Sequence, residues 1–237
     1  RIIFFASIII IIFLIPNLAE GYESTWDEVN INTNNNYNAA VIDSNGDAWV
    51  FGDNGVIIHG EKLTNWSIVN SPTVEDILTA DSNENLVVAA GKNGVVIYKE
   101  IQSNEWINID IDNQTRINSV SINNVDEIVI VTDLGDIQIF KDNEWLQINS
   151  LTSEKLFDIT FESERGLISG SSGLILGSED NGLTWEVRDT PEIVAESEII
   201  SIGYYKANRA YAITSEGNIL KSTQESLTTT VGYSWTI

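Results

Sequence analysis

The sequence contains no cysteine in 237 residues, which excludes disulfides, thiolate metal sites and thiol nucleophiles. Its one histidine, His59, cannot build a polyhistidine metal centre, and we interpret it as a surface residue of a strand. Cations are scarce, because 12 Lys and Arg face 35 Asp and Glu and give a net charge of −23. That field repels phosphate backbones, so we expect no nucleic-acid partner. The acids are scattered, as on a solvated surface; a partner that seeks acidic groups is the alternative.

One long apolar run, Ile2 to Ile15, ends at Pro16, and Ala19-Glu20-Gly21 follows it with a small-x-small pattern. A membrane-spanning helix needs about 20 apolar residues, whereas the core of a signal peptide needs about 7 to 15. We therefore interpret residues 1–21 as a signal peptide cleaved near Gly21, with an uncleaved membrane anchor as the alternative. The protein is then exported to a periplasmic, lumenal or extracellular space, and it contacts a membrane only if this segment is retained.

Tryptophan and glycine recur with a common period in the remaining residues, 22–237. Six of the seven tryptophans form a series with intervals of 39 or 40 residues, except for the last interval of 50. The tryptophans of this series are Trp26, Trp66, Trp106, Trp145, Trp185 and Trp235, and the glycines in phase with them are Gly55, Gly94, Gly135, Gly173 and Gly217. Two series in phase indicate an internal repeat.

Each period contains four short runs in which apolar and polar residues alternate, with Asn, Asp, Gly and Ser between the runs, which predicts four strands joined by hairpin turns. A unit of about 40 residues cannot bury both faces of its sheet alone, so the units must stack. Stacking around an axis satisfies the sheet edges better than a linear solenoid does. We therefore predict an all-β protein, a β-propeller whose tryptophans pack between four-stranded blades. The first strands are expected at Tyr37–Ile42, Glu75–Ala80, Arg116–Ile122, Lys155–Phe161 and Glu198–Tyr204.

Five units are visible, at about residues 37–70, 74–110, 115–149, 155–189 and 197–237. Residues 23–30, around Trp26, resemble only the last strand of a unit and suggest a further blade. The sequence has no methionine, starts at Arg1 and stops at a strand. We therefore expect the five units to be a fragment of a ring of about six to eight blades.

The fourth unit carries the octapeptide Ser178-Glu179-Asp180-Asn181-Gly182-Leu183-Thr184-Trp185, which fits the Asp-box pattern Ser-x-Asp-x-Gly-x-Thr-Trp. The chemistry of the pattern is local: a carboxylate can accept hydrogen bonds from turn amides, Gly permits a left-handed backbone, and Trp is buried beneath the hairpin. We interpret Ser178, Asp180, Gly182, Thr184 and Trp185 as structural; a calcium or glycan site is the alternative.

The stretch from Lys155 to Arg188, with Gly170-Ser171-Ser172-Gly173 before the Asp box, resembles the photosystem II stability and assembly factor family of Asp-box (BNR-like) propellers. The resemblance covers about residues 37–237 as architecture, while the other units keep the Gly and Trp and replace the box. It implies a seven-bladed, exported propeller that holds a protein client without doing chemistry. The basic surface patch of those factors is not matched, since Lys92, Lys99 and Arg116 are among few cations here.

Sialidases share the Asp box, but their activity needs three converging arginines. Arg165 is expected at a strand edge and Arg188 just after the Asp-box Trp, so both are poorly placed to converge. A pair of carboxylates for another glycosidase is always available among 35 acids. Asp43–Asp47 imitates the start of a calcium loop, but Ala48 and Asn54 stand where Gly and Glu are required. We predict no catalytic, cofactor or metal site.

The function predicted is a noncatalytic exported scaffold that binds a protein client, and a secreted carbohydrate-binding or glycosidase-like module is the alternative. Partner contacts are expected on the rim that carries the turns between second and third strands and the connections between blades. The candidate rim residues are Asp53, Lys92, Asp133, Glu216 and Arg116.

Overall fold

The computed structural model describes residues 28–205, 209–224 and 233–236, and for 223–224 and 233–236 it describes the backbone only. The chain forms one compact unit from Thr33 to Ile237, preceded by a separate segment up to Asn32. Apart from short 3₁₀ turns, the described residues form only strands, which confirms the all-β class. In this described part, no helix combines the length and the apolar character that crossing a bilayer requires.

The strands of the compact unit pair into five four-stranded antiparallel sheets, each built from four consecutive strands. The first two sheets contain β1 Tyr37–Ile42, β2 Ala48–Gly52, β3 Ile57–Glu61 and β4 Asn65–Val69, then β5 Ile77–Ser82, β6 Leu86–Gly91, β7 Val96–Glu100 and β8 Ile107–Asn108. The third and fourth contain β9 Ile117–Ile122, β10 Ile128–Thr132, β11 Ile137–Lys141 and β12 Glu144–Ile148, then β13 Leu156–Glu162, β14 Arg165–Gly170, β15 Ile175–Ser178 and β16 Glu186–Val187. The fifth contains β17 Ile199–Tyr204, β18 Ala210–Thr214, β19 Ile219–Gln224 and β20 Tyr233–Thr236.

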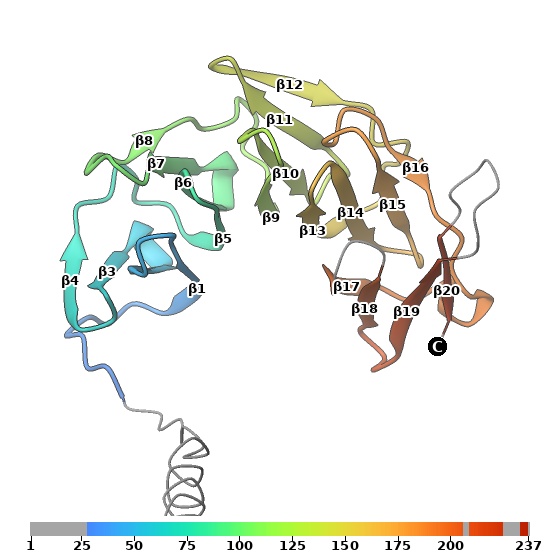
Figure 1. Ribbon diagram of the computed structural model, residues 1–237, viewed down its shortest axis with the longest axis horizontal. Coiled ribbons are helices and arrows are strands. Elements are labelled where there is room, and N and C mark those ends of the chain that lie inside the picture. Colours follow the sequence, from blue (N-terminus) through green and yellow to red (C-terminus); the bar gives the residue numbers. More distant parts are fainter. Residues whose placement is uncertain (1–27, 206–208, 225–232, 237) are drawn as a thin grey trace, which may run out of the picture. The chain divides into compact units, whose positions relative to one another are not determined.

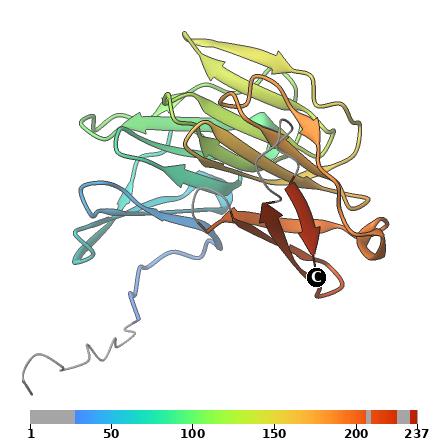
Figure 2. The same ribbon diagram turned by 45° about the vertical axis from the view of Figure 1, so that its right-hand side comes forward.

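The five sheets follow one another in chain order along an open arc, as the blades of a propeller do (Figures 1 and 2). The first strand of each blade lies on the inside of the arc and contacts the first strand of the next blade, from β1 to β17. The fourth strands lie on the outside (Figure 1). Blade one is the sheet of β1 to β4, and the numbering continues to blade five.

Each inner strand carries an irregularity after its first residue. The pairing register shifts between Tyr37 and Ala39 in β1, and the same shift occurs in the other four blades. A β-bulge of this kind bends the strand and redirects one side chain. In blades one and three, that side chain is Asn38 or Asn118, and its amide donates to a backbone carbonyl of the next blade, at Ile77 (2.9 Å) and Leu156 (2.7 Å).

The five phased glycines all adopt a left-handed backbone in the turn between the second and third strands. Their φ angles are 69° at Gly55, 74° at Gly94, 80° at Gly135, 68° at Gly173 and 88° at Gly217. Four of them also lie against the chain that leads to the next blade: a methyl group at Gly173, for example, would collide with the carbonyl of Val194. Glycine is therefore required here by conformation and by close approach.

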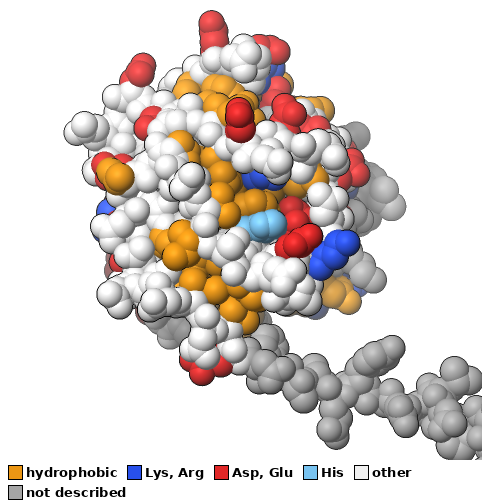
Figure 3. All heavy atoms as spheres, turned by 90° about the vertical axis from the view of Figure 1, so that its left-hand side faces the viewer, with side chains coloured by type: hydrophobic (Ala, Val, Ile, Leu, Met, Phe, Trp, Pro, Cys, Tyr) orange, Lys and Arg blue, Asp and Glu red, His pale blue; other side chains and the backbone are white. Residues whose placement is uncertain are grey.

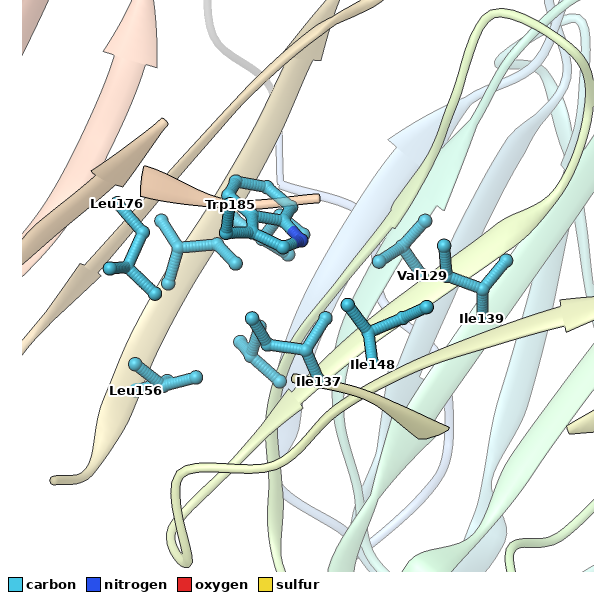
Figure 4. Packing of buried hydrophobic residues seen from close by; sticks show 10 residues of the cluster. Val129, Ile137, Ile139, Ile148, Leu156, Leu176 and Trp185 are labelled. Carbon is cyan, nitrogen blue, oxygen red and sulfur yellow. The ribbon is translucent and has the colours of Figure 1, made fainter. Parts of the chain in front are cut away.

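Four buried clusters fill the four interfaces between neighbouring blades. Trp106, Trp145 and Trp185 each pack into the cluster shared with the preceding blade, as the repeat predicted. Figure 4 shows the interface of blades three and four, where Trp185 points from the fourth blade toward Val129 and Ile139 of the third. Burying each large side chain contributes about 1.5–3 kcal/mol, so the blades stabilise one another.

Several expectations fall outside the described residues. The predicted signal peptide, residues 1–21, lies there, as do Trp26 and the side chain of Trp235. Of the further strand expected at 23–30, residues 23–27 lie outside the description and residues 28–30 are not in a strand.

Candidate functional site

Asp53, Lys92, Asp133 and Glu216 lie at the turns between second and third strands, and Arg116 lies at the end of the connection between blades two and three, on the same face. Asp53, Lys92 and Asp133 open these turns, and their backbone N–H groups donate to the residue that precedes the first strand of the same blade. In blade five the equivalent donor is Ser215, so Glu216 is one position further along the turn.

The side chains of Arg116, Asp133 and Lys92 bind neighbouring polar side chains of the protein. Asn118 donates to Asp133 (2.7 Å) and accepts from the Nε of Arg116 (2.9 Å). Lys92 pairs with Asp76 at 2.7 Å, and the backbone N–H of Asn54 donates to the same carboxylate. The hydrogen bonds from Lys92 and then Asn54 lower the pKa of Asp76. The rim is therefore ordered by internal contacts, and partner contacts there stay a prediction.

The Asp box uses its own polar groups inside the hairpin. Asp180 accepts from the backbone N–H of Thr184 (2.9 Å) and from its hydroxyl (2.6 Å), while Ser178 accepts from the N–H of Gly182 (3.0 Å). The indole of Trp185 donates to the carbonyl of Gly182 at 2.9 Å. Burial of Asp180 raises its pKa, but the hydrogen bonds from Thr184 and Ser178 outweigh that effect and the pKa is lowered.

Two arginines beside the Asp box do converge, contrary to the sequence-based expectation. Arg165 and Arg188 both reach Glu179, with N···O distances of 3.6 and 3.4 Å. They come from β14 and from just after β16, which the sheet brings together around the box. The carboxylate that they share is that of Glu179, a residue of the protein itself. In a sialidase, the arginines would instead bind the carboxylate of the sialic acid substrate.

The inner strands of blades two to five line a polar hollow of about 480 Å³ along the inside of the arc. Asp158 of β13 accepts from the hydroxyls of Ser119 in blade three and Ser201 in blade five, both at 2.9 Å, and from the N–H of Ile202 at 3.0 Å. Asp81 of β5 accepts from Ser121 (3.0 Å) and from the N–H of Ile122 (2.8 Å) in blade three. These two carboxylates therefore link neighbouring blades.

The side of the molecule that carries β4 and β8 shows a histidine with hydrophobic side chains on one side of it and acidic side chains on the other (Figure 3). His59 stacks on Trp49, with ring centroids 4.2 Å apart, and lies 3.0 Å from Asp47. Lys99 lies over the same indole at 4.8 Å and is only 4% exposed. Burial lowers the pKa of Lys99, while Asp43 and Asp47 act in the opposite direction. Asp43 also accepts the Trp49 indole N–H at 2.9 Å. Backbone hydrogen bonds from the N–H of Asp43 to the carbonyl of Asp47 and from the N–H of Gly46 to the carbonyl of Asp43, both 2.9 Å, make residues 43–47 a hairpin turn.

A groove of about 590 Å³ lies between blades two and three, on the face opposite the rim, where the first-to-second and third-to-fourth strand turns are. Tyr98 and Phe140, 6.3 Å apart, lie along it, and carboxylates from both blades surround them. The third-to-fourth strand turn of blade three has only two residues, Asp142 and Asn143, both with positive φ (51° and 65°). Such a tight hairpin does not reach over the neighbouring blade.

A family model described as Photosynthesis system II assembly factor YCF48 matches residues 70–223. The match covers more than half of the chain. The chain belongs to this family. The sequence matches no curated protein at a significant level.

Solved structures of YCF48 have the same fold as this family member. One, YCF48 bound to D1 peptide, is 15% identical with a TM-score of 0.65, and the match covers 84% of this chain and 67% of that one. YCF48 from Cyanidioschyzon merolae is 14% identical with a TM-score of 0.62, covering 82% and 71%. Virginiamycin B lyase from Staphylococcus aureus is 13% identical with a TM-score of 0.64, covering 82% and 72%, so the fold also hosts an enzyme.

The groove of this YCF48-family propeller was missed by sequence reasoning, which selected the opposite rim. Its walls come from turns about 40 residues apart, such as Glu84–Asn85 and Val125–Asp126, whose polar residues read only as hairpin turns. One signal was present: the third unit shortens the Asp box to Lys141-Asp142-Asn143-Glu144. A shortened turn on a repeated scaffold leaves space beside the preceding blade.

Proposed function

We propose that this protein is an exported, noncatalytic propeller that binds a segment of a protein client. Membership of the YCF48 family supports a role in assembly, and a structure of similar fold carries the D1 peptide. The apolar run from Ile2 to Ile15 supports export. The identity of the client does not transfer from a relative at 15% identity, which shares the fold.

The observation that carries the proposal is the groove between blades two and three. Its volume of about 590 Å³ lies in the range of ligand sites, and aromatic side chains are half-buried along it. Aromatic rings that keep one face accessible are typical anchors for peptides. The rim residues Asp53, Lys92, Asp133, Glu216 and Arg116 remain predicted as further contacts.

The proposal that the protein is noncatalytic is supported by the hydrogen bonds that the carboxylates of the inner hollow make between blades. Asp81 and Asp158 accept hydrogen bonds from backbone N–H groups and serine hydroxyls of neighbouring blades. A general acid or base needs its carboxyl oxygen directed at a substrate. These carboxylates serve the fold, and they favour a scaffold over a glycosidase.

The test is a display library of random 15-residue peptides selected on the whole protein, run beside a glycan array. We expect peptides to be enriched, to bind with Kd values near the micromolar range, and to be displaced by one another. Enrichment of no peptide, or recognition of a glycan instead, would overturn client binding. Export is tested separately by fusing residues 1–30 to alkaline phosphatase in a bacterial host, where we expect activity only outside the cytoplasm.

A further inference from the structure

The groove between blades two and three carries a strong excess of negative charge. Five carboxylates and one ammonium group, that of Lys141, line it. The carboxylates are Glu84 and Glu100 from blade two and Asp126, Glu127 and Asp142 from blade three. Any occupant must therefore meet acidic groups from both sides.

Part of this charge is used within the protein. Glu127 pairs with Lys141 at 3.2 Å and accepts from Asn123 at 2.8 Å. Asp126 accepts from the amides of Asn83 (2.6 Å) and Asn85 (2.8 Å) across the blade interface. Both carboxylates therefore help to fix the shape of the groove.

Three carboxylates have no such partner. In the described part of the chain, the side chains of Glu84, Glu100 and Asp142 make no hydrogen bond or ion pair, and all three residues are exposed. The half-buried rings of Tyr98 and Phe140 and the aliphatic side chain of Leu86 line the same groove. The groove thus combines aromatic side chains with unpaired negative charge.

We propose that the groove binds an extended client segment that carries Lys or Arg residues, a proposal that rests on the client-binding function above. Long cationic side chains match both parts of the site, because their aliphatic stems pack on rings while their charged ends reach carboxylates. The net charge of −23 adds long-range attraction that raises the association rate. The groove therefore favours basic client segments over neutral or acidic ones.

The experiment measures fluorescence anisotropy of three labelled 12-residue peptides on the whole protein: one with five Lys and one Arg, its Gln-substituted analogue and an acidic analogue. The site variant combines Glu84→Gln, Glu100→Gln and Asp142→Asn, and Asn suits the positive φ of residue 142. The control variant combines Glu154→Gln, Glu192→Gln and Glu196→Gln, which removes the same charge from exposed residues of the blade connections on the opposite face. A Tyr98→Leu variant removes the aromatic face, and thermal melts confirm that each variant is folded.

We expect the basic peptide to bind the native protein and the control variant alike, and the site variant about tenfold more weakly, since each exposed ion pair contributes little and three are lost. Tyr98→Leu weakens binding of the basic peptide, and 500 mM NaCl weakens it further. Equal loss in the site and control variants would show a nonspecific charge effect and overturn the proposal. Tighter binding of the Gln analogue would overturn the basic specificity while leaving client binding intact, whereas no binding of any peptide, including those from the display library, would overturn both.

Discussion

Replacing Asp158 by asparagine removes the charge from a side chain that links three blades while keeping its size. Each carboxylate oxygen accepts a backbone N–H: that of Ile159 at 3.0 Å on one oxygen, and that of Ile202 at 3.0 Å on the other. Two serine hydroxyls, of Ser119 and Ser201, complete the set. An amide has only one acceptor oxygen, so in either orientation its NH₂ faces one of these fixed N–H donors.

The loss of stability caused by Asp158→Asn follows from these hydrogen bonds. A backbone donor left without an acceptor costs about 1–3 kcal/mol, and the remaining bonds weaken because their acceptor is no longer charged. We therefore expect Asp158→Asn to lower the free energy of unfolding by about 3 kcal/mol, which adds the loss of one hydrogen bond from a backbone N–H to the weakening of the remaining hydrogen bonds. For a domain of this size, that lowers the Tm by about 6–12 °C. Calorimetry and urea unfolding measure it.

The matched control is Asp112→Asn, the same chemical change at an exposed residue of the connection between blades two and three. We expect it to change stability by less than about 0.5 kcal/mol. If Asp158→Asn melts at the same temperature as the native protein, Asp158 is not an inter-blade link. A melt that rises, with loss of a hydrolytic activity, would instead identify a catalytic acid whose charge is costly to the fold.

Two further predictions use other features of the blades. Gly173→Ala should destabilise the protein by more than Gly217→Ala, because the new methyl group at residue 173 meets the carbonyl of Val194, whereas residue 217 has a similar positive φ but open space around it. Comparing the two Tm values separates the effect of close approach from that of backbone strain. Equal losses would refute the role of the blade connection. The pKa of Asp180 is lowered by hydrogen bonds from Thr184 that outweigh its burial, so its stabilising effect is complete above the unfolded pKa of about 4 and is lost as the pH falls through the lower folded pKa. Asp180→Asn should therefore flatten the loss of stability as the pH falls below about 4, and an unchanged acid limb in urea titrations would contradict this.

The sequence was sufficient for the architecture because the repeat imposes the same local requirements five times. A glycine with positive φ and a tryptophan in an inter-blade core leave residue-type signals that depend on nearby chain alone, as at Gly94 and Trp145. The inner-strand bulge left no such signal, because the residue that it redirects is Asn38 in one blade and Phe157 in another.

The candidate site could not be read in the same way. The hydrogen bond from Asn83 to Asp126, and the pairing of Asp81 with Ser121, join residues 40 or more positions apart on different blades. Asp and Asn are ordinary turn residues, so their composition predicts a hairpin whether or not they also line a groove. Which acids face one another depends on the angle between blades, and this is set by the buried clusters rather than by the turns.

The Asp box of blade four explains why the groove lies between blades two and three. Its longer hairpin reaches back to blade three, where the amide of Asn123 donates to the carbonyl of Asn181 at 2.9 Å. In blade three a two-residue turn replaces that hairpin, and the space beside blade two stays open.

Replacing residues 141–145 by the sequence of residues 178–185 should therefore close the groove and abolish binding of the basic peptide, with the fold retained because the same hairpin already fits one position further along the arc. A Gly-Ser loop of equal length, which lacks the internal hydrogen bonds of the box, is the control and should leave most of the binding intact. Undiminished binding by a folded Asp-box graft would show that the peptide binds elsewhere, with the rim of Asp53, Lys92 and Asp133 as the next surface to test.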